Sequence, residues 1–281
     1  MSSFRRKQVN IHPLEPAKNH YASLKKLSDG KNLERAELDE VAFPASDYSS
    51  GTLIYTLMAP HYLTIEQAEE LKTSMQYPAN SSDQTKAELE YLLEWEKKRS
   101  KEQTDRAVNV LARIGYWPHI DILATHHRYN ENLDHLLYEG RTVMGKHVTA
   151  KNYPATTHLL RGVTKDMRLM EFKVKYHLLR PRPYHLESKL NPLARISSPS
   201  FASGHTLWAY IQAFTWSELI PQKRKSFLDV AYEVGESREI MGIHYPSDEE
   251  AARVLAHKML VAMCSNPQFI RDLDAAKKEW K

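Results

Sequence analysis

The stretch SREIMGIHYPSD, residues 237–248, decides how the chain folds and where its chemistry lies. Apolar residues recur at helical spacing on both sides of it, and Pro246 separates the two sides because proline cannot continue a helix. His244 precedes this turn, and Asp248 opens the next helix four residues later. A carboxylate so placed can hold one imidazole nitrogen and leave the lone pair of the other available. The stretch therefore predicts two helices with a candidate nucleophile between them.

Helical periodicity continues along the chain, and no segment shows the alternation typical of a strand. Only 9 glycines and 14 prolines among 281 residues also favour long helices. We therefore predict an all-α fold, a helical bundle. The predicted helices cover residues 65–75 with Thr64 as N-cap, a segment from residue 84, residues 120–138 closed by Gly140, and residues 155–179, 204–220, 222–242, 248–264 and 267–280.

The composition excludes several classes of protein. No run approaches the roughly 20 apolar residues that a membrane-spanning helix needs, so a membrane-embedded enzyme is not expected. The formal charge is +4, and basic residues are interleaved with acids rather than massed as in nucleic-acid binders. Cys264 is the only cysteine, so no intrachain disulfide can form.

The N-terminus gives an expectation about location. Arg5-Arg6-Lys7 is similar to the start of a signal peptide, but the apolar stretch that should follow is absent. The sequence as given therefore predicts a soluble cytoplasmic protein. Removal of a signal peptide would make the mature chain periplasmic or secreted.

A second segment, KYHLLRPRP at residues 175–183, carries residues suited to binding an anion. It places Lys175, Arg180 and Arg182 at a helix end that the prolines fix. Guanidinium groups match phosphoryl oxygens in a bidentate way, and lysine adds a point charge. Taken alone, basic residues in a last helical turn also complement the helix dipole, so this segment does not decide between the two roles.

A third segment, SFASGHT at residues 200–206, precedes an apolar helix. It offers the Ser203 hydroxyl, unbonded backbone N–H groups and the His205 imidazole at a helix start, where oxyanions bind. A serine N-cap beside a solvated histidine explains it equally well. Arg238 likewise offers a guanidinium for an anion or a surface ion pair. The three segments together make coincidence improbable.

In this order and spacing the segments resemble the type 2 phosphatidic acid phosphatase superfamily, whose motifs are K-x6-R-P, P-S-G-H and S-R-x5-H-x3-D. Residues 175–183 fit the first motif, residues 203–205 the second, and residues 237–248 the third at complete spacing. The sequence is most similar to bacterial class A non-specific acid phosphatases, which are related to vanadium haloperoxidases. Their K-x4-R-x-R-P motif selects Lys175 and Arg182. The chain departs from the family pattern at Pro181, Ala202 and Met241.

The resemblance begins near residue 78 and implies two parts. Residues 78–281 would form a helical phosphatase domain that holds the catalytic site, and residues 1–77 a partly helical N-terminal extension. Residues 1–50 are polar and poorly periodic, so we expect them to be extended or loosely packed.

The resemblance also implies a mechanism. The chain would be a metal-independent acid phosphatase that hydrolyses phosphomonoesters through a phosphohistidine on His244, with phosphotransfer to alcohols as a further activity. Asp248 would hold the His244 ring, and His205 would act as general acid and base. No cofactor is implied, and no metal-ligand spacing is present. The phosphate would be bound by Lys175, Arg182, Ser203, Gly204 and Arg238, with Arg180 and Ser237 as additional candidates.

Two other functions stay open at this stage. A vanadium-dependent haloperoxidase would use the same three motifs around vanadate. A membrane-associating lipid-phosphate phosphatase would bind membranes through residues 1–77, where Leu53 to Met58 is apolar. A catalytically silent binding protein is disfavoured because the motif set is complete. The partner is a phosphomonoester of undetermined identity, and homo-oligomer formation is undetermined.

Overall fold

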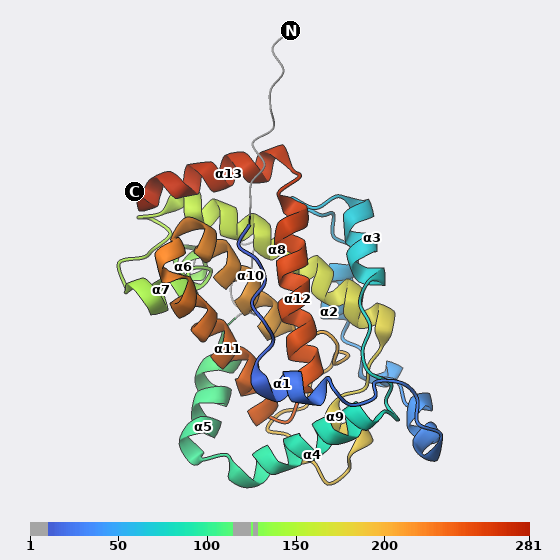
Figure 1. The fold of residues 1–281 in the computed structure, drawn as a ribbon. Helices are drawn as coiled ribbons and strands as arrows, with labels where there is room; N and C mark the ends of the chain where they lie inside the picture. The colour runs from blue at the N-terminus through green and yellow to red at the C-terminus, as the bar shows by residue number, and fades with distance from the viewer. Residues whose placement is uncertain (1–10, 115–124, 126–128) are drawn as a thin grey trace.

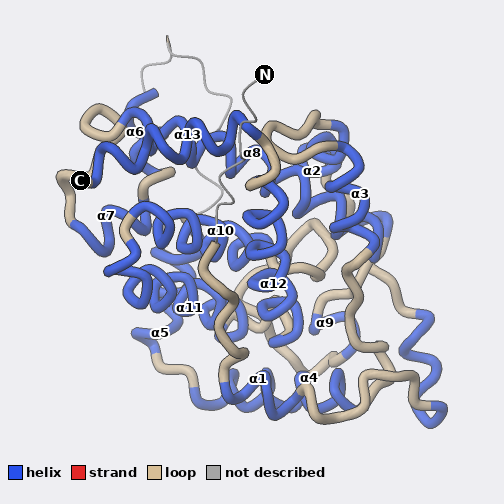
Figure 2. Tube along the Cα trace, turned by 45° about the horizontal axis from the view of Figure 1, so that its top comes forward, coloured by secondary structure: helices blue, strands red, loops and turns tan. Residues whose placement is uncertain are grey.

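The helices expected from periodicity form in the protein. A computed structural model describes residues 11–114, 125 and 129–281, and these residues form helices and loops without a strand (Figure 2). The all-α prediction is confirmed. The α-helices are α1 (Asn19–Leu24), α2 (Ser50–Leu53), α3 (Ile65–Thr73), α4 (Asp83–Lys98), α5 (Lys101–Asp105), α6 (Tyr129–His135), α7 (Tyr138–Met144), α8 (Pro154–Leu178), α9 (Pro183–Leu186), α10 (Gly204–Leu219), α11 (Arg224–Ile240), α12 (Pro246–Met263) and α13 (Pro267–Lys277).

The central element is α10, which packs against α8, α11 and α12 (Figure 1). Its sequence is apolar on all sides, and such a helix must be covered on all sides. Leu207, Ile211 and Trp216 are fully buried. Every α10 residue is buried except His205. The imidazole in the first turn is therefore the only α10 side chain that is not buried.

Prolines set the ends of the long helices. The observed bounds of α8, α10, α11 and α12 lie within two residues of the predicted ones. Pro221 and Pro246 stand at the junctions, where a missing N–H is tolerated in the first helical turn. Thr64 caps α3, since its hydroxyl accepts a hydrogen bond from the backbone N–H of Gln67 at 3.1 Å.

The prediction of one helix over residues 120–138, closed by Gly140, is wrong. Part of this range lies outside the described residues, and the comparison concerns the remainder. α6 ends at His135, and Gly140 lies inside the separate helix α7. A Cβ atom at position 140 would overlap the ring of Trp216. The glycine is therefore needed for close packing against α10, and α7 ends instead before Gly145, which has a φ of 109°.

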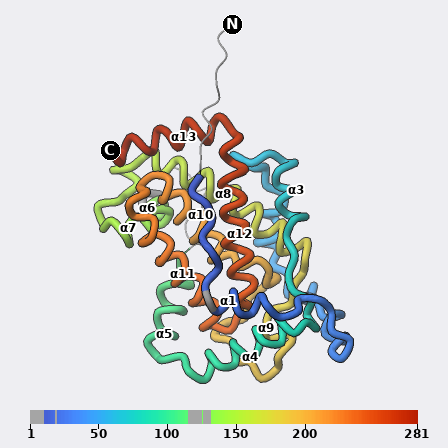
Figure 3. The backbone as a smooth tube through the Cα atoms, viewed as in Figure 1, coloured from blue at the N-terminus to red at the C-terminus, as the bar shows by residue number. Residues whose placement is uncertain are grey.

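The N-terminal residues pack more closely than expected. Residues 11–18 are extended, as predicted, but they lie along the helical core rather than loosely beside it (Figure 3). Glu218 accepts hydrogen bonds from the backbone N–H of His12 at 3.0 Å and from its ring at 2.7 Å. Tyr62 is fully buried in the main core. The division at residues 77 and 78 stays a prediction.

Three loops meet at one end of the core. They follow α8, precede α10 and join α11 to α12, and they carry the three segments singled out in the sequence. The backbone N–H of Ser200 donates to the carbonyl of Arg180 at 2.9 Å, and that of Ser203 donates to the carbonyl of Asp248 at 3.2 Å. Backbone hydrogen bonds thus hold all three segments together.

Candidate active site

His244 is held in one tautomer by its two neighbours. Its Nδ1 lies 3.0 Å from Oδ2 of Asp248, and its Nε2 lies 2.8 Å from Nη1 of Arg182. An arginine can only donate, so Nε2 accepts and the proton belongs on Nδ1. The ring is 4% exposed. His244 therefore presents an unprotonated Nε2 while a buried carboxylate supports the opposite edge of its ring.

Asp248 is itself fixed by several donors. Arg180 Nη1 donates to Oδ1 at 2.7 Å, and the Ser200 hydroxyl donates to Oδ2 at 2.5 Å. Burial alone would raise the pKa of Asp248, but the Arg180 charge and the His244 ring outweigh it, so this pKa lies well below its usual range. Arg180 also pairs with Glu88, whose Oε2 lies 3.3 Å away. The carboxylate beside His244 is therefore permanently charged.

Arg182 connects two of the three loops. Its Nη1 donates to the carbonyl of Ile243 at 2.9 Å, and its Nε donates to the carbonyl of Ser198 at 2.9 Å. The guanidinium is 1% exposed. Because these contacts use planar, fixed donors, they aim the remaining N–H groups at His244 and the space beside it.

A cavity of about 300 Å³ opens next to His244. Arg182, His205, Arg238 and His244 all line it, so the two predicted imidazoles and two predicted guanidinium groups share one space. The carbonyl of Ala112 lies 3.1 Å from Nε2 of His205, which places a proton on that nitrogen. The cavity combines the acceptor nitrogen of His244, the imidazole of His205 and two permanent positive charges, which suits a tetrahedral oxyanion.

Hydrogen bonds connect two other predicted site residues to the loops around the cavity. Lys175 Nζ donates to the carbonyls of Pro199 and Ser200 at 2.8 and 3.0 Å. Ser237 accepts from Arg238 Nη2 at 2.8 Å and so orients its guanidinium. The described lining does not include Lys175, Arg180, Ser203, Gly204 or Ser237. Direct contact of these residues with a phosphate stays a prediction.

Burial and mutual repulsion lower the pKa values of the basic groups. Burial and then the Arg182 charge hold the pKa of His244 well below its ordinary value, and burial with Arg238 does the same for His205. Burial and Arg182 lower the pKa of Lys175 to about 7. A bound anion offsets these effects, because it supplies the negative charge that each protonated group requires.

Comparison with known proteins places part of the chain in a family. Residues 155–270 match the family model of the PAP2 superfamily. This region is a PAP2 superfamily domain. It contains all ten predicted site residues, and the sequence-based recognition of the family is confirmed.

The chain has curated relatives among bacterial phosphatases. It is 32% identical over 142 residues to a non-specific acid phosphatase of Providencia stuartii. This alignment covers 48% of this chain and 57% of the relative. It is 27% identical over 143 residues to a non-specific acid phosphatase of Salmonella typhimurium. This alignment covers 49% of this chain and 57% of the relative. The chain thus spans little more than half the length of these relatives. A bacterial vanadium-dependent iodoperoxidase has a similar fold, with a TM-score of 0.54 at 15% identity over 86% of this chain and 64% of the other.

Some residues of the PAP2 site carried no recognisable signal in the sequence. Glu88 lies on α4, outside the matched region, and its contact with Arg180 spans 92 residues. Ser200 lies in a segment with several serines, so sequence alone did not identify it as the donor to Asp248. The Ala112 contact uses a backbone carbonyl, which any residue type provides.

No described helix of the chain is both long and apolar enough to cross a bilayer.

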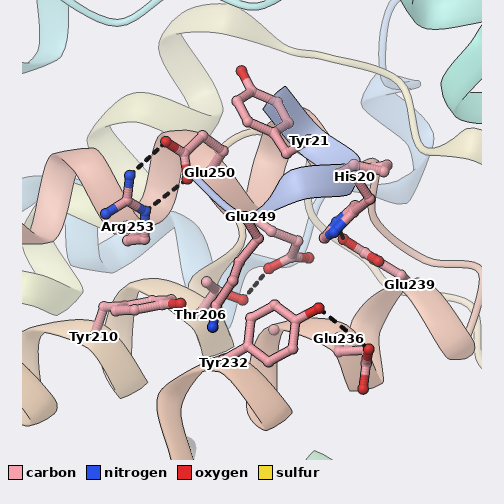
Figure 4. A pocket seen from close by; sticks show the side chains of 13 residues that line it. His20, Tyr21, Thr206, Tyr210, Tyr232, Glu236, Glu239, Glu249, Glu250 and Arg253 are labelled. Atoms are coloured by element: carbon pink, nitrogen blue, oxygen red, sulfur yellow. Dashed lines mark hydrogen bonds and ion pairs between the residues drawn. The ribbon is translucent and has the colours of Figure 1, made fainter. Parts of the chain in front are cut away.

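A second, small pocket of about 30 Å³ lies close to the PAP2 site (Figure 4). Glutamates 236, 239, 249 and 250 line it, and Glu239 lies beside His20 of the N-terminal segment, whereas Glu250 pairs with Arg253. Thr206 donates to Glu249 there, and Ser203 donates to Thr206 at 3.0 Å. Lys18 lies over the ring of Tyr232 at 4.4 Å. His20 pairs with Glu239 there, its Nε2 lying 3.5 Å from Oε1, so the pocket is a contact between the N-terminal segment and the helices that carry His205 and Arg238.

Proposed function

We propose that the chain is a metal-independent acid phosphatase that hydrolyses phosphomonoesters through a phosphohistidine on His244. The observation that carries this proposal is the unprotonated Nε2 of His244 at the wall of a cavity that Arg182, Arg238 and His205 also line. The likeness to bacterial non-specific acid phosphatases supports it.

In the first step, Nε2 of His244 attacks phosphorus as the bond to the ester oxygen breaks. Arg182 transfers its N–H contact from Nε2 to a phosphoryl oxygen, and Arg238 stabilises the opposite side. Asp248 balances the positive charge that develops on the imidazole. His205 gives its proton to the leaving alcohol oxygen, so the alcohol departs neutral.

In the second step, His205 takes a proton from water, and the water oxygen attacks phosphorus as the P–N bond breaks. Inorganic phosphate leaves, and both histidines return to their starting states. An alcohol in place of water would give phosphotransfer. Lys175, Ser203 and Gly204 complete the proposed phosphate contacts, while Arg180 and Ser237 hold Asp248 and Arg238 in position.

The proposal requires a neutral His244 and a protonated His205, so the rate should depend on pH as a bell. Burial and the neighbouring guanidinium groups lower the pKa values of both histidines. Both limbs of the bell therefore move to lower pH, and maximal activity should lie on the acid side of neutrality.

The decisive test is His244→Ala. We expect kcat on p-nitrophenyl phosphate to fall by at least about 10³-fold, as for other removed nucleophiles. After an alkaline quench, the wild-type protein should carry an alkali-stable, acid-labile phosphoryl label that the variant lacks. His158→Ala, which changes a mostly exposed histidine, should behave as wild type. A His244→Ala protein with a tenth of wild-type activity would exclude a nucleophilic role.

Chelator and vanadate separate the proposal from the haloperoxidase alternative. A metal-independent phosphatase keeps its full rate in EDTA, and vanadate inhibits it by occupying the phosphoryl site. A haloperoxidase instead gains hydrogen-peroxide-dependent iodide oxidation when vanadate is added. Iodide oxidation together with absent phosphatase activity would overturn the proposal.

One observation favours a second candidate, a membrane-associating lipid-phosphate phosphatase. Leu53, Ile54 and Leu57 are 42%, 62% and 83% exposed on a segment whose Thr52 lines the cavity. Exposed apolar side chains beside an active site suit an interface. Flotation with anionic liposomes tests this candidate: the wild-type protein should float, and a Leu53→Ser/Ile54→Ser/Leu57→Ser variant should not.

A further inference from the structure

The cavity beside His244 is lined by two chemically different groups of residues. One group consists of the basic residues described above. The other group is apolar, comes from several parts of the chain and, except for Phe172, belongs to one apolar cluster; its members are Ala112, Phe172, Ala194, Ile196, Met241 and Ile243. A phosphoryl group bound among the basic residues would therefore direct the rest of its ester toward an apolar surface.

Among the residues that the structure describes, those lining the cavity offer few hydrogen-bonding partners to a leaving alcohol with several hydroxyl groups. It contains no carboxylate or carboxamide, and its hydroxyls belong to Thr52, Ser197 and Ser198. The Thr52 hydroxyl already donates to the carbonyl of Ser49 at 2.9 Å and lies 2.7 Å from the hydroxyl of Tyr176. Ser198 accepts from Arg182 Nη2 at 3.3 Å. Sugar hydroxyls brought into this space would lose water without gaining equivalent partners.

The N-terminal part of the chain supplies one wall of the cavity. α2 and the following turn η3 (Ile54–Leu57) place Thr52 on it, although they lie outside the region that matches the family. Two contacts fasten this segment to α8: the Thr52–Tyr176 hydrogen bond and the stacking of Tyr55 on Phe172 at 5.4 Å. This wall is therefore held firmly in place.

We propose that the site selects phosphomonoesters whose leaving alcohol is apolar, and that Ile196 and Phe172 contribute to the surface that selects them. The proposal rests on the proposed phosphatase function and specifies its substrate class. Discrimination arises in kcat/KM, because an apolar leaving group gains contact with this wall in the transition state, whereas a polar one keeps unsatisfied hydroxyls.

A matched pair of substrates tests the selection. Cyclohexylmethyl phosphate and glucose 6-phosphate are both primary alkyl esters with a six-membered ring, and they differ mainly in their hydroxyl groups. We expect kcat/KM for the cyclohexylmethyl ester to be at least about tenfold higher. An active enzyme that hydrolyses both equally, or glucose 6-phosphate faster, would overturn the selection and leave the phosphatase proposal intact. No hydrolysis of either ester or of p-nitrophenyl phosphate would remove both.

A variant tests the assignment of the wall. Ile196→Asn puts hydrogen-bonding groups on the apolar side and should reduce the ratio between the two esters at least about fivefold. Ile196→Val, which is smaller but apolar, should keep the ratio and shows whether the position tolerates change. Leu57→Asn makes the same type of change at a solvent-exposed position of segment 50–57 and should leave the ratio unaltered. A folded Ile196→Asn protein with the wild-type ratio contradicts the role of this wall.

Discussion

At the scale of single residues, the pair His244–Asp248 determines reactivity. The carboxylate accepts from Nδ1 and so keeps the proton off Nε2. In Asp248→Asn the amide can donate to Nδ1, which moves the ring proton to Nε2 and removes the nucleophile. We expect kcat to fall about 10³- to 10⁴-fold with little change in KM, as measured by steady-state kinetics.

A carboxylate two residues further along α12 provides the control for that change. Glu250→Gln alters a residue that pairs with Arg253 and has no hydrogen bond to His244. It should retain wild-type kcat. The thermal stability of both variants should be measured as well, because Asp248→Asn also deprives the buried Arg180 of an anionic partner. Equal kcat in the two variants would show that Asp248 does not set the tautomer.

Lys175 gives a prediction about proton uptake. Burial and Arg182 lower its pKa to about 7, so most of this amine is neutral at pH 8 in the empty protein. An anion in the neighbouring cavity raises the pKa again, and binding then takes up protons. Calorimetric titration with inorganic phosphate at pH 8, in buffers of different ionisation enthalpy, should show this uptake.

The matched variant for this measurement is Lys175→Arg, which stays charged at pH 8. The number of protons taken up should fall by as much as one relative to wild type, whereas uptake by the histidines persists in both. Identical uptake in the two proteins would show that Lys175 is already charged before the anion binds.

At the scale of elements, the loop between α11 and α12 presents His244 and depends on Gly242. This residue has a φ of 68°, and a Cβ atom there would lie 2.7 Å from Cδ2 of Leu190. We expect Gly242→Ala to lower the free energy of unfolding by about 1–2 kcal/mol through backbone strain and to reduce kcat by displacing the loop. Urea denaturation and kinetics measure both effects.

Gly30→Ala is the control for that loop, because its Cβ atom would meet only the Ser28 hydroxyl at 3.8 Å. Both its stability and its kcat should stay close to wild type. A Gly242→Ala protein with unchanged stability and kcat would mean that the loop accommodates the methyl group without moving His244.

The sequence predicted those elements that local rules determine. Apolar spacing and prolines place α8, α10, α11 and α12 within two residues, because both signals lie inside each helix. Gly140 was misassigned because its role depends on Trp216, which is distant in the sequence and close in the fold. The motif residues His205, His244, Arg182 and Arg238 do line one cavity. The support from Glu88 depends on tertiary packing of α4, which no local pattern encodes.

At the scale of the whole molecule, the N-terminal segment fastens distant helices through His20. The ring stacks on Tyr91 of α4 at 5.6 Å, and its Nε2 lies 3.5 Å from Oε1 of Glu239 on α11. The hydrogen bond that the His20 ring donates to Glu239 raises the pKa of His20 above its ordinary value, although burial opposes this. Glu239 also directly follows Arg238 in the chain, so this contact lies behind the cavity wall.

The raised pKa means that folding favours the protonated ring. The stabilisation is fully present below pH 6.5, where the unfolded chain is protonated too, and it is lost as pH rises through the pKa of the folded state. His20→Gln should therefore lower the free energy of unfolding more at pH 5.5 than at pH 8.5, as measured by urea denaturation. His158→Gln, at a position that is 62% exposed, should show a smaller pH-dependent difference. A His20→Gln penalty that is the same at both pH values would show that the stacking on Tyr91, rather than the charge, fastens the segment.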